Sequence, residues 1–250
     1  FEDLLNQEIK HSINLSRDEF LSLTYRSLTD HYIMGKLLLL FNVETVRLLK
    51  NSNEKYSFSA HKDIDGWSLE HIHAQESQGL NTEKEWIEWL QDHRKSLLEL
   101  PYNHDEQSRA SILNENRNEL ISRIDTAMQS ISRPLFLELF TDIIKMLSEN
   151  GETDYLHSMA NMALLSKGTN SAFNNSTFAV KRMKMLDKDK NGDYIPICTR
   201  RVFLKYYTNK VNQQLCFWSK DDREAYIKAF VGSEDRPGLI SPYLNENNQR

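Results

Sequence analysis

Two separate stretches of the chain carry side chains that suit hydrolysis at phosphorus. In the first, Glu70 directly precedes His71, and in the second Asn170 follows Asn161 nine positions later. An imidazole, with an unperturbed pKa of about 6.5, accepts a proton from water near neutral pH. Carboxylate and amide oxygens are the ligands that Mg²⁺ prefers. The pattern predicts a metal-dependent nuclease site in which His71 is the general base and Glu70 and Asn170 hold Mg²⁺ or Mn²⁺.

The direct adjacency of Glu70 and His71 sets a condition on the backbone. Neighbouring side chains of a strand point to opposite faces, so these two converge only where the strand ends or bends. The polar stretch 75–79 that follows favours such an ending.

Short strands and a helix are predicted around these residues. Asp65-Gly66 predicts a turn, residues 67–72 a strand after it, and 162–165 a second strand. The alternation at 56–60 predicts a further short strand. We expect 167–169 to turn and 170–186 to form one helix.

Helices are predicted over most of the remaining chain. Apolar spacing predicts an entry segment that is helical from Ser16 to Leu49, and three helices between residues 80 and 150. Capping signals are assigned to Ser16, to Thr82 with Glu85, to Thr199, and to Ser219 with Asp222. The last helix should end near Gly232, and the tail from Pro237 should be frayed. The fold class predicted is therefore α+β and mostly α-helical.

Composition narrows the function classes. The 250 residues include 39% hydrophobic ones, enough for a sizeable core, and no apolar run reaches the roughly 18 residues of a membrane span. A cytoplasmic setting is expected. The two cysteines, Cys198 and Cys216, form no CxxC pair, which argues against zinc held by thiolates, and both are expected in the core.

The charge pattern favours local contact with nucleic acid over wholesale wrapping. The net charge of the chain is −5, but residues 178–205 hold eight basic residues against three aspartates. This stretch directly follows the predicted site, where a phosphate backbone would lie. The residues expected to bind nucleic acid are Lys181, Arg182, Lys184, Arg200 and Arg201.

Two other functions stay open from the residues alone. His71 and His73 form a His-x-His pair, which is typical of zinc hydrolases, although further ligands are not evident. The second alternative is a catalytically inactive DNA- or protein-binding regulatory module on the same fold.

Several motifs in order resemble the HNH nuclease domain of GmrSD-type restriction systems, a branch of the His-Me finger nucleases. The similarity spans about residues 30–230 and includes the aromatic segment that begins at Trp218. Its motifs are Glu70-His71-Ile72-His73-Ala74-Gln75, then His157 to Ser166 with Asn161 at its centre, then Asn170, Phe178 and Lys181.

The resemblance implies a role for each matched position. His71 would be the general base, Glu70 and Asn170 would hold one divalent ion, Asn161 would pin the loop of a ββα-metal finger, and Lys181 would contact phosphate. The chain departs from the family at Ala74, where Pro is usual, and at 160–162, where Gly-Asn-Leu is usual. These departures concern loop geometry more than chemistry.

The resemblance also predicts organisation and partners. Residues 1–55 would be a helical lead-in, 56–210 the nuclease domain with a helical insertion at 80–150, and 211–250 a C-terminal helix and tail. The chain would be a fragment of a longer protein in which an upstream nucleotide-hydrolysing sensor domain accompanies the nuclease. The expected partner is foreign or modified DNA, in antiviral defence, with no membrane partner and a homodimer left open.

Overall fold

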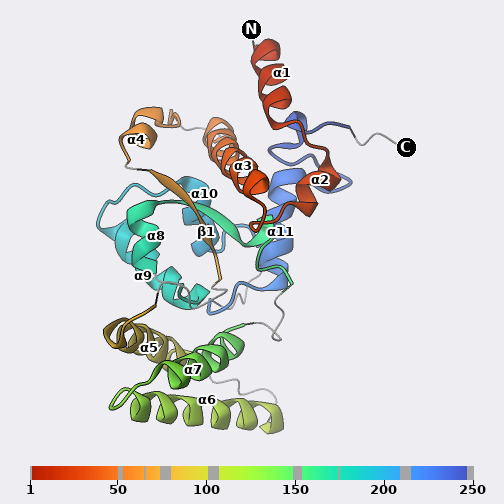
Figure 1. Cartoon of the computed structure of the whole chain (residues 1–250). Coiled ribbons are helices and arrows are strands. Elements are labelled where there is room, and N and C mark those ends of the chain that lie inside the picture. The colour runs from red at the N-terminus through yellow and green to blue at the C-terminus, as the bar shows by residue number, and fades with distance from the viewer. Residues whose placement is uncertain are drawn as a thin grey trace.

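The protein is mostly helical, with a single two-stranded sheet in the part of the chain that the structure describes (Figure 1). The computed structural model describes residues 2–49, 53–64, 66–73, 80–100, 107–148, 154–173, 175–208 and 215–246, without the side chains of 107–113, 170 and 172. The α+β, mostly helical class predicted from the sequence is confirmed. Among these residues no helix has the length and apolar content to cross a membrane.

The sheet joins the two motif-bearing stretches. β1 (Trp67–His71) pairs antiparallel with β2 (Met162–Ser166), with Glu70 opposite Ala163 and His71 opposite Met162. The predicted strands at 67–72 and 162–165 are therefore confirmed. Because side chains alternate along a strand, Trp67, Leu69 and His71 share one face and Glu70 belongs to the other.

Helices from both ends of the chain build one hydrophobic core around this sheet (Figure 1). From the N-terminal part come α1 (Glu2–Ile13), α2 (Arg17–Ser22) and α3 (Leu28–Arg47), whereas the short α4 (Phe58–Asp63) contributes no buried residue. After β2 come α8 (Lys167–Phe173), α9 (Phe178–Lys190), α10 (Ile197–Phe203) and α11 (Lys220–Val231). The stacked rings of Phe41 from α3 and Phe230 from α11, 3.7 Å apart, join the two groups.

The insertion between the strands has a core of its own. α5 (Glu83–Leu98), α6 (Gln107–Ala127) and α7 (Arg133–Met146) pack together in the lower part of Figure 1, around Trp89, Phe136 and their neighbours. The three predicted helices are confirmed. Buried His93 of α5 anchors this unit, since its Nε2 accepts a hydrogen bond from the backbone N–H of Thr177, just before α9, at 3.0 Å.

Most of the predicted caps are present. Ser16 with Glu19, Thr82 with Glu85, and Ser219 with Asp222 each form a capping box in which side chain and backbone bond reciprocally. Gly232 ends α11 with a φ of +78°, a left-handed conformation that favours glycine. The cap assigned to Thr199 is wrong: Pro196 precedes α10, and the Thr199 hydroxyl instead donates to the Leu164 carbonyl at 2.7 Å.

Two short segments differ from the prediction. The stretch 56–60 is no strand: Ser57 Oγ accepts from the Ala60 N–H at 3.2 Å and starts α4, and this cap outweighs the period-two pattern. The expected turn at 167–169 and single helix over 170–186 are also wrong. α8 begins directly after β2 at Lys167, and residues around Ser176 separate it from α9.

The C-terminal tail is packed, not frayed, through residue 246. Ile240, Tyr243 and Leu244 are buried in the main core around the short 3-10 helix η2 (Ser241–Tyr243). The N–H of Asn245 donates to the carbonyl of Leu15 at 2.7 Å. The Pro- and Asn-rich composition concealed these apolar side chains; residues 247–250 lie outside the described part.

Candidate active site

Glu70 lies at the centre of a buried ion pair. Its Oε1 is 2.5 Å from Nζ of Lys181, which projects from the first turn of α9 and has no exposed surface. The same ammonium donates to the backbone carbonyl of His71 at 2.5 Å. Burial raises the pKa of Glu70 and lowers that of Lys181, and each partner opposes the shift of the other.

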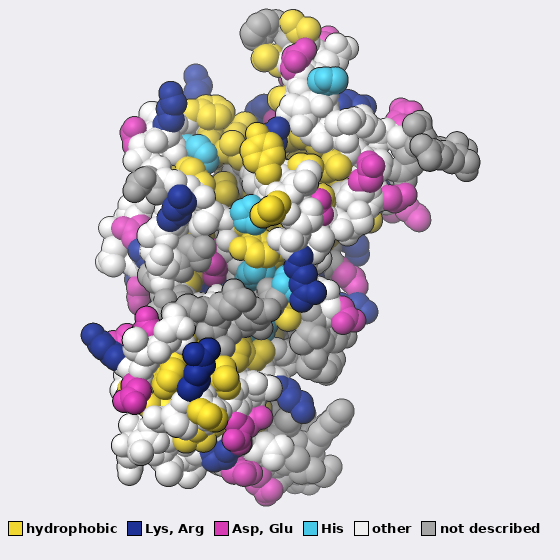
Figure 2. Space-filling view, viewed as in Figure 1, with side chains coloured by type: hydrophobic (Ala, Val, Ile, Leu, Met, Phe, Trp, Pro, Cys, Tyr) yellow, Lys and Arg dark blue, Asp and Glu magenta, His cyan; other side chains and the backbone are white. Residues whose placement is uncertain are grey.

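His71 occupies the opposite face of β1, among aromatic and imidazole rings. Its ring centroid is 4.5 Å from that of Tyr25, in an edge-on contact, and 5.9 Å from that of His157. Burial, with smaller contributions from Lys181, His157 and His31, lowers the pKa of His71 to about 3, so the ring is neutral at pH 7. On the face of the molecule drawn in Figure 2, histidine side chains gather with hydrophobic ones near the centre.

One ring nitrogen of His71 has no protein partner. Among the described residues, Nε2 is buried and receives or donates no hydrogen bond. A buried imidazole nitrogen without a partner is energetically costly, which is typical of a group that acts on a ligand or water. His71 therefore has the protonation state that a general base needs, and Nε2 supplies the lone pair when the proton of the neutral ring is on Nδ1.

The two side chains are not in direct contact in the described part of the chain. Glu70 faces α9 and His71 faces Tyr25, as strand alternation requires, although β1 does end at His71. The backbone links them, because Lys181 bonds both the Glu70 carboxylate and the His71 carbonyl. The stretch 75–79, which was expected to favour the end of the strand, lies outside the described residues.

Asn161 holds the segment that leaves β1. Its Oδ1 accepts from the N–H of His73 at 2.9 Å, and its Nδ2 donates to the carbonyls of His73 and Leu156 at 3.1 and 3.0 Å. The side chain is fully buried, and its own carbonyl accepts from the Ile72 N–H. Asn161 thus lies where a residue that pins this loop has to lie.

The nitrogen atoms of His73 are engaged within the protein. Nε2 is 2.9 Å from the hydroxyl of Ser148, and Nδ1 accepts from the N–H of Phe178 at 3.4 Å. Burial lowers the pKa of His73 to about 3. These contacts leave His73 without a free nitrogen for the zinc pair considered with His71.

Asn170 comes from the element expected to carry it, the helix that follows β2. It is the fourth residue of α8, a helix that contacts both strands. Its side chain lies outside the description, so the structure places its backbone only.

The five basic residues expected to bind nucleic acid lie in different surroundings. Lys181 is wrong as a direct phosphate contact, because its ammonium is fully buried against Glu70. Lys184 pairs with Asp92 at 2.8 Å, and Arg200 with Asp189 at 3.3 Å. Arg182 and Arg201 are half-buried. Phosphate contact by the other four stays a prediction.

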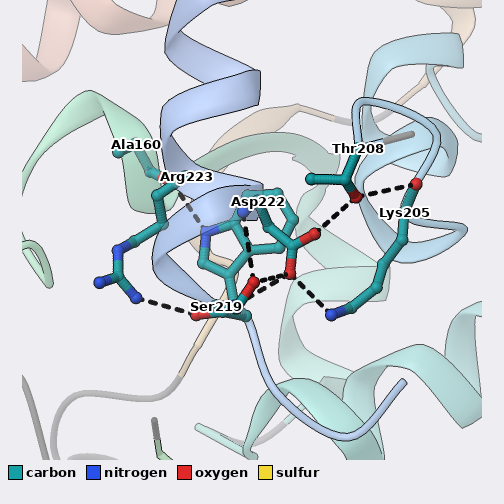
Figure 3. A network of polar contacts seen from close by, with 7 residues as sticks. Ala160, Lys205, Thr208, Ser219, Asp222 and Arg223 are labelled. Atoms are coloured by element: carbon teal, nitrogen blue, oxygen red, sulfur yellow. Dashed lines mark hydrogen bonds and ion pairs between the residues drawn. The ribbon is translucent and has the colours of Figure 1, made fainter. Parts of the chain in front are cut away.

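A polar network behind the sheet supports the 3-10 helix η1 (Met159–Asn161). The indole of Trp218 donates to the Ala160 carbonyl at 2.9 Å, next to Asn161 in the chain (Figure 3). The buried carboxylate of Asp222 caps α11 through Ser219 and pairs with buried Lys205 at 2.7 Å. Sequence reasoning recognised this cap but missed its connection to the site.

Tyr25 and His157 were also missed as neighbours of His71. Tyr25 lies just before α3, where its N–H donates to the His157 carbonyl at 2.8 Å. His157 opens the motif that runs to Ser166 but was given no role, Tyr25 belongs to no motif, and a bridge between Thr24 and Ser158 brings the two segments together. Only the tertiary structure identifies them.

A carboxylate such as that of Glu70 and an amide such as that of Asn170 carry the oxygen atoms that suit a hard divalent ion. Glu70 is buried, and its ion pair with Lys181 means that a divalent ion has to compete with an ammonium. In the described residues no group of three or more His, Cys, Asp or Glu side chains is arranged to hold a metal. Oxygen donors of these two types are the ligands that Mg²⁺ prefers, whereas Zn²⁺ prefers nitrogen and sulfur ligands.

Comparisons with protein-family models, with curated proteins and with solved structures found no match.

Proposed function

We propose that the protein is a metal-dependent DNA endonuclease with a ββα-metal, HNH-type core formed by β1, β2 and α8. The observation that carries the proposal is the neutral, buried His71 with an unpartnered Nε2. It stands on a sheet whose exit loop is held by Asn161, and its strand also carries Glu70. The types and order of these residues suit hydrolysis of a phosphodiester.

In this proposal His71 accepts the proton of the attacking water at Nε2. A pKa of about 3 would make the imidazole a weak base, but the arrival of a phosphate anion nearby would raise that pKa towards neutrality. Tyr25 and His157 fix the orientation of the ring by packing against it. The Lys181 bond to the His71 carbonyl fixes the backbone at the same residue.

Glu70 and Asn170 would hold the divalent ion. When bound, the ion would supply positive charge to the non-bridging and leaving oxygens of the phosphodiester. Lys181 balances the charge of the Glu70 carboxylate beforehand and opposes the rise in its pKa that burial causes. Arg182, Lys184, Arg200 and Arg201 would contact the flanking phosphates.

The biological setting follows from the resemblance to restriction nucleases. We place the reaction in cytoplasmic defence against foreign or modified DNA, in concert with a nucleotide-hydrolysing sensor domain. A homodimer would allow both strands to be cut.

Metal-dependent cleavage of supercoiled plasmid tests the proposal. The parent should nick or linearise the plasmid with Mg²⁺ or Mn²⁺ and stop with EDTA, and Asn170→Ala should cut far more slowly. Glu70→Gln, which keeps the shape of the side chain, should lose activity as well. Cleavage that persists in EDTA, or that both variants retain, would contradict the assignment of these residues.

A second function is favoured by one observation. The buried Glu70–Lys181 pair already balances the charge of the carboxylate, as it would in a catalytically inactive DNA- or protein-binding module. Retained DNA binding with no cleavage under Mg²⁺, Mn²⁺, Co²⁺ or Zn²⁺ would support this alternative.

A further inference from the structure

A pocket of about 300 Å³ opens beside the candidate active site, between α3 and β1. One side of α3 lines it with residues one helical turn apart, His31, Gly35 and Leu39. Leu69 and Leu164 line it from the sheet. The volume is at the small end of ligand pockets and suits a single flat heterocycle.

An aromatic wall borders the pocket and is held rigid. The His61 ring stacks on Trp67 with centroids 4.3 Å apart and planes 9° apart. The Trp67 indole donates to the His61 carbonyl at 2.8 Å, and Tyr56 Oη lies 2.9 Å from His61 Nδ1. A preorganised aromatic wall suits the stacking of a nucleobase, because every base has a flat π-face.

The polar side chains at the pocket suit an anionic ligand. Lys36 lies at the rim with its ammonium 4.6 Å from the ring centroid of Tyr32, which is 66% exposed. No carboxylate occurs among the described residues that line the pocket. A flat wall with a lysine beside it matches a base that carries a phosphate.

The pocket lies near the surroundings of His71, with the ring of Tyr25 between His31 and His71. His31 lines the pocket, and the ring of Tyr25 lies 5.0 Å from His31 and 4.5 Å from His71. Trp67 and His71 share one face of β1, four residues apart, which is about 13 Å. That distance corresponds to about four stacked nucleotides and to fewer in an extended strand.

We propose that this pocket binds an unpaired base of single-stranded DNA whose backbone also reaches the surroundings of His71. The inference rests on the proposed nuclease function and names its substrate as a strand with at least one unstacked base. A base within a duplex is stacked on both sides, so it enters the pocket only after local unpairing.

Gly35 gives a direct way to close the pocket. A Cβ built at Gly35 meets no atom within 4 Å, so Gly35→Ala introduces no clash at this position. Gly35→Leu should extend from the same Cβ into the pocket and obstruct it, while improving helix propensity. Gly35→Ala adds one methyl group and serves as the matched control.

The test measures binding in EDTA, by fluorescence anisotropy, with labelled strands of about 12 nucleotides. One strand is oligo-dT, and the other is an abasic strand of equal length with the same phosphates. The parent and Gly35→Ala should bind oligo-dT about fivefold or more tighter than the abasic strand. Gly35→Leu should bind both strands about equally while its urea unfolding midpoint is not lowered.

Other results would overturn the inference. Equal binding of both strands by the parent, or an unchanged preference in Gly35→Leu, would show that the pocket takes no base. Tighter binding of oligo-U RNA than of oligo-dT, abolished by the same substitution, would overturn the assignment to DNA.

His71→Ala separates this inference from the proposed function. It should keep the preference for oligo-dT while losing plasmid cleavage. A parent that shows the Gly35-sensitive preference but never cleaves DNA would refute the nuclease and leave the pocket assignment standing. A parent that cleaves DNA but shows no preference for oligo-dT would refute the pocket assignment and leave the nuclease function standing.

Discussion

Replacement of Lys181 by methionine leaves Glu70 buried without its cationic partner. Both side chains are almost fully inside the core, 0% exposed for Lys181 and 6% for Glu70, so solvent screens the pair little. Methionine fills a similar volume, so the main change is electrostatic. Without the ammonium, the carboxyl of Glu70 avoids the cost of a buried charge by taking up a proton.

The magnitude follows from that proton. In the unfolded chain Glu70 ionises with a pKa of about 4.3, and keeping it neutral costs about 1.4 kcal/mol for each pH unit above that value. The loss of unfolding free energy in Lys181→Met is therefore about 4 kcal/mol at pH 7 and about 1 kcal/mol at pH 5. The loss is larger at pH 7 than at pH 5 because a carboxyl with a raised pKa in the folded state stabilises the folded state at pH values below its unfolded pKa. That stabilising contribution is lost as the pH rises.

Urea denaturation, followed by far-UV circular dichroism at pH 5 and pH 7, measures both values. Lys84→Met is the matched control, since Lys84 is 85% exposed in its pair with Glu88, and it should change stability little at either pH. Adding Glu70→Gln to Lys181→Met should remove the pH dependence. If Lys181→Met loses less than about 1 kcal/mol at pH 7, equally at both pH values, the buried pair is refuted and Lys181 regains a phosphate-binding role.

Three further substitutions test other parts of the account. Asn161→Ala breaks three hydrogen bonds and leaves the His73 N–H without its partner, so we expect a loss of about 2–4 kcal/mol in urea denaturation; a neutral effect would show that the loop does not depend on this side chain. Burial lowers the pKa of His93 to about 3. The contribution of the neutral ring to the free energy of unfolding is therefore full above about pH 6.5 and falls by about 1.4 kcal/mol for each pH unit below that value. Compared with a substitution at exposed His11, His93→Leu should be less stable at pH 7, and its free energy of unfolding should change less between pH 7 and pH 5. An unchanged pH dependence of the unfolding free energy would contradict the assignment of this contribution to His93. Gly232→Ala places a Cβ against the backbone of Arg236 and Gly238 at positive φ and should lower the thermal midpoint by several degrees, whereas Gly35→Ala, in open space, should not; equal midpoints would contradict the packing of the tail.

Local signals were predictable from the sequence because they act over a few residues. The capping boxes of Thr82 with Glu85 and of Ser219 with Asp222 depend on a three-residue spacing, and both are present. Apolar runs predicted β1 and β2 correctly. The period-two pattern at 56–60 failed because the side-chain cap of Ser57 starts a helix within it.

Long-range pairings were not predictable in the same way. A lysine on a helix is most often exposed. Nothing near Lys181 in the chain indicates that its ammonium is buried in an ion pair with Glu70. Tyr25 reaches His71 only because the segment before α3 pairs with Ser158. Leu244 lies in a polar tail, and its burial depends on the contact with the N-terminal segment at Leu15.

The most direct test of the central claim is the initial rate of plasmid cleavage by His71→Ala, with Mg²⁺ at pH 7. General base catalysis contributes about 10²- to 10⁴-fold, so we expect the rate to fall by at least about a hundredfold while the variant stays folded. His11→Ala, at an exposed position on α1, should cleave at the parent rate. If His71→Ala cleaves as fast as His11→Ala, His71 is not the base, and the candidate active site is misplaced.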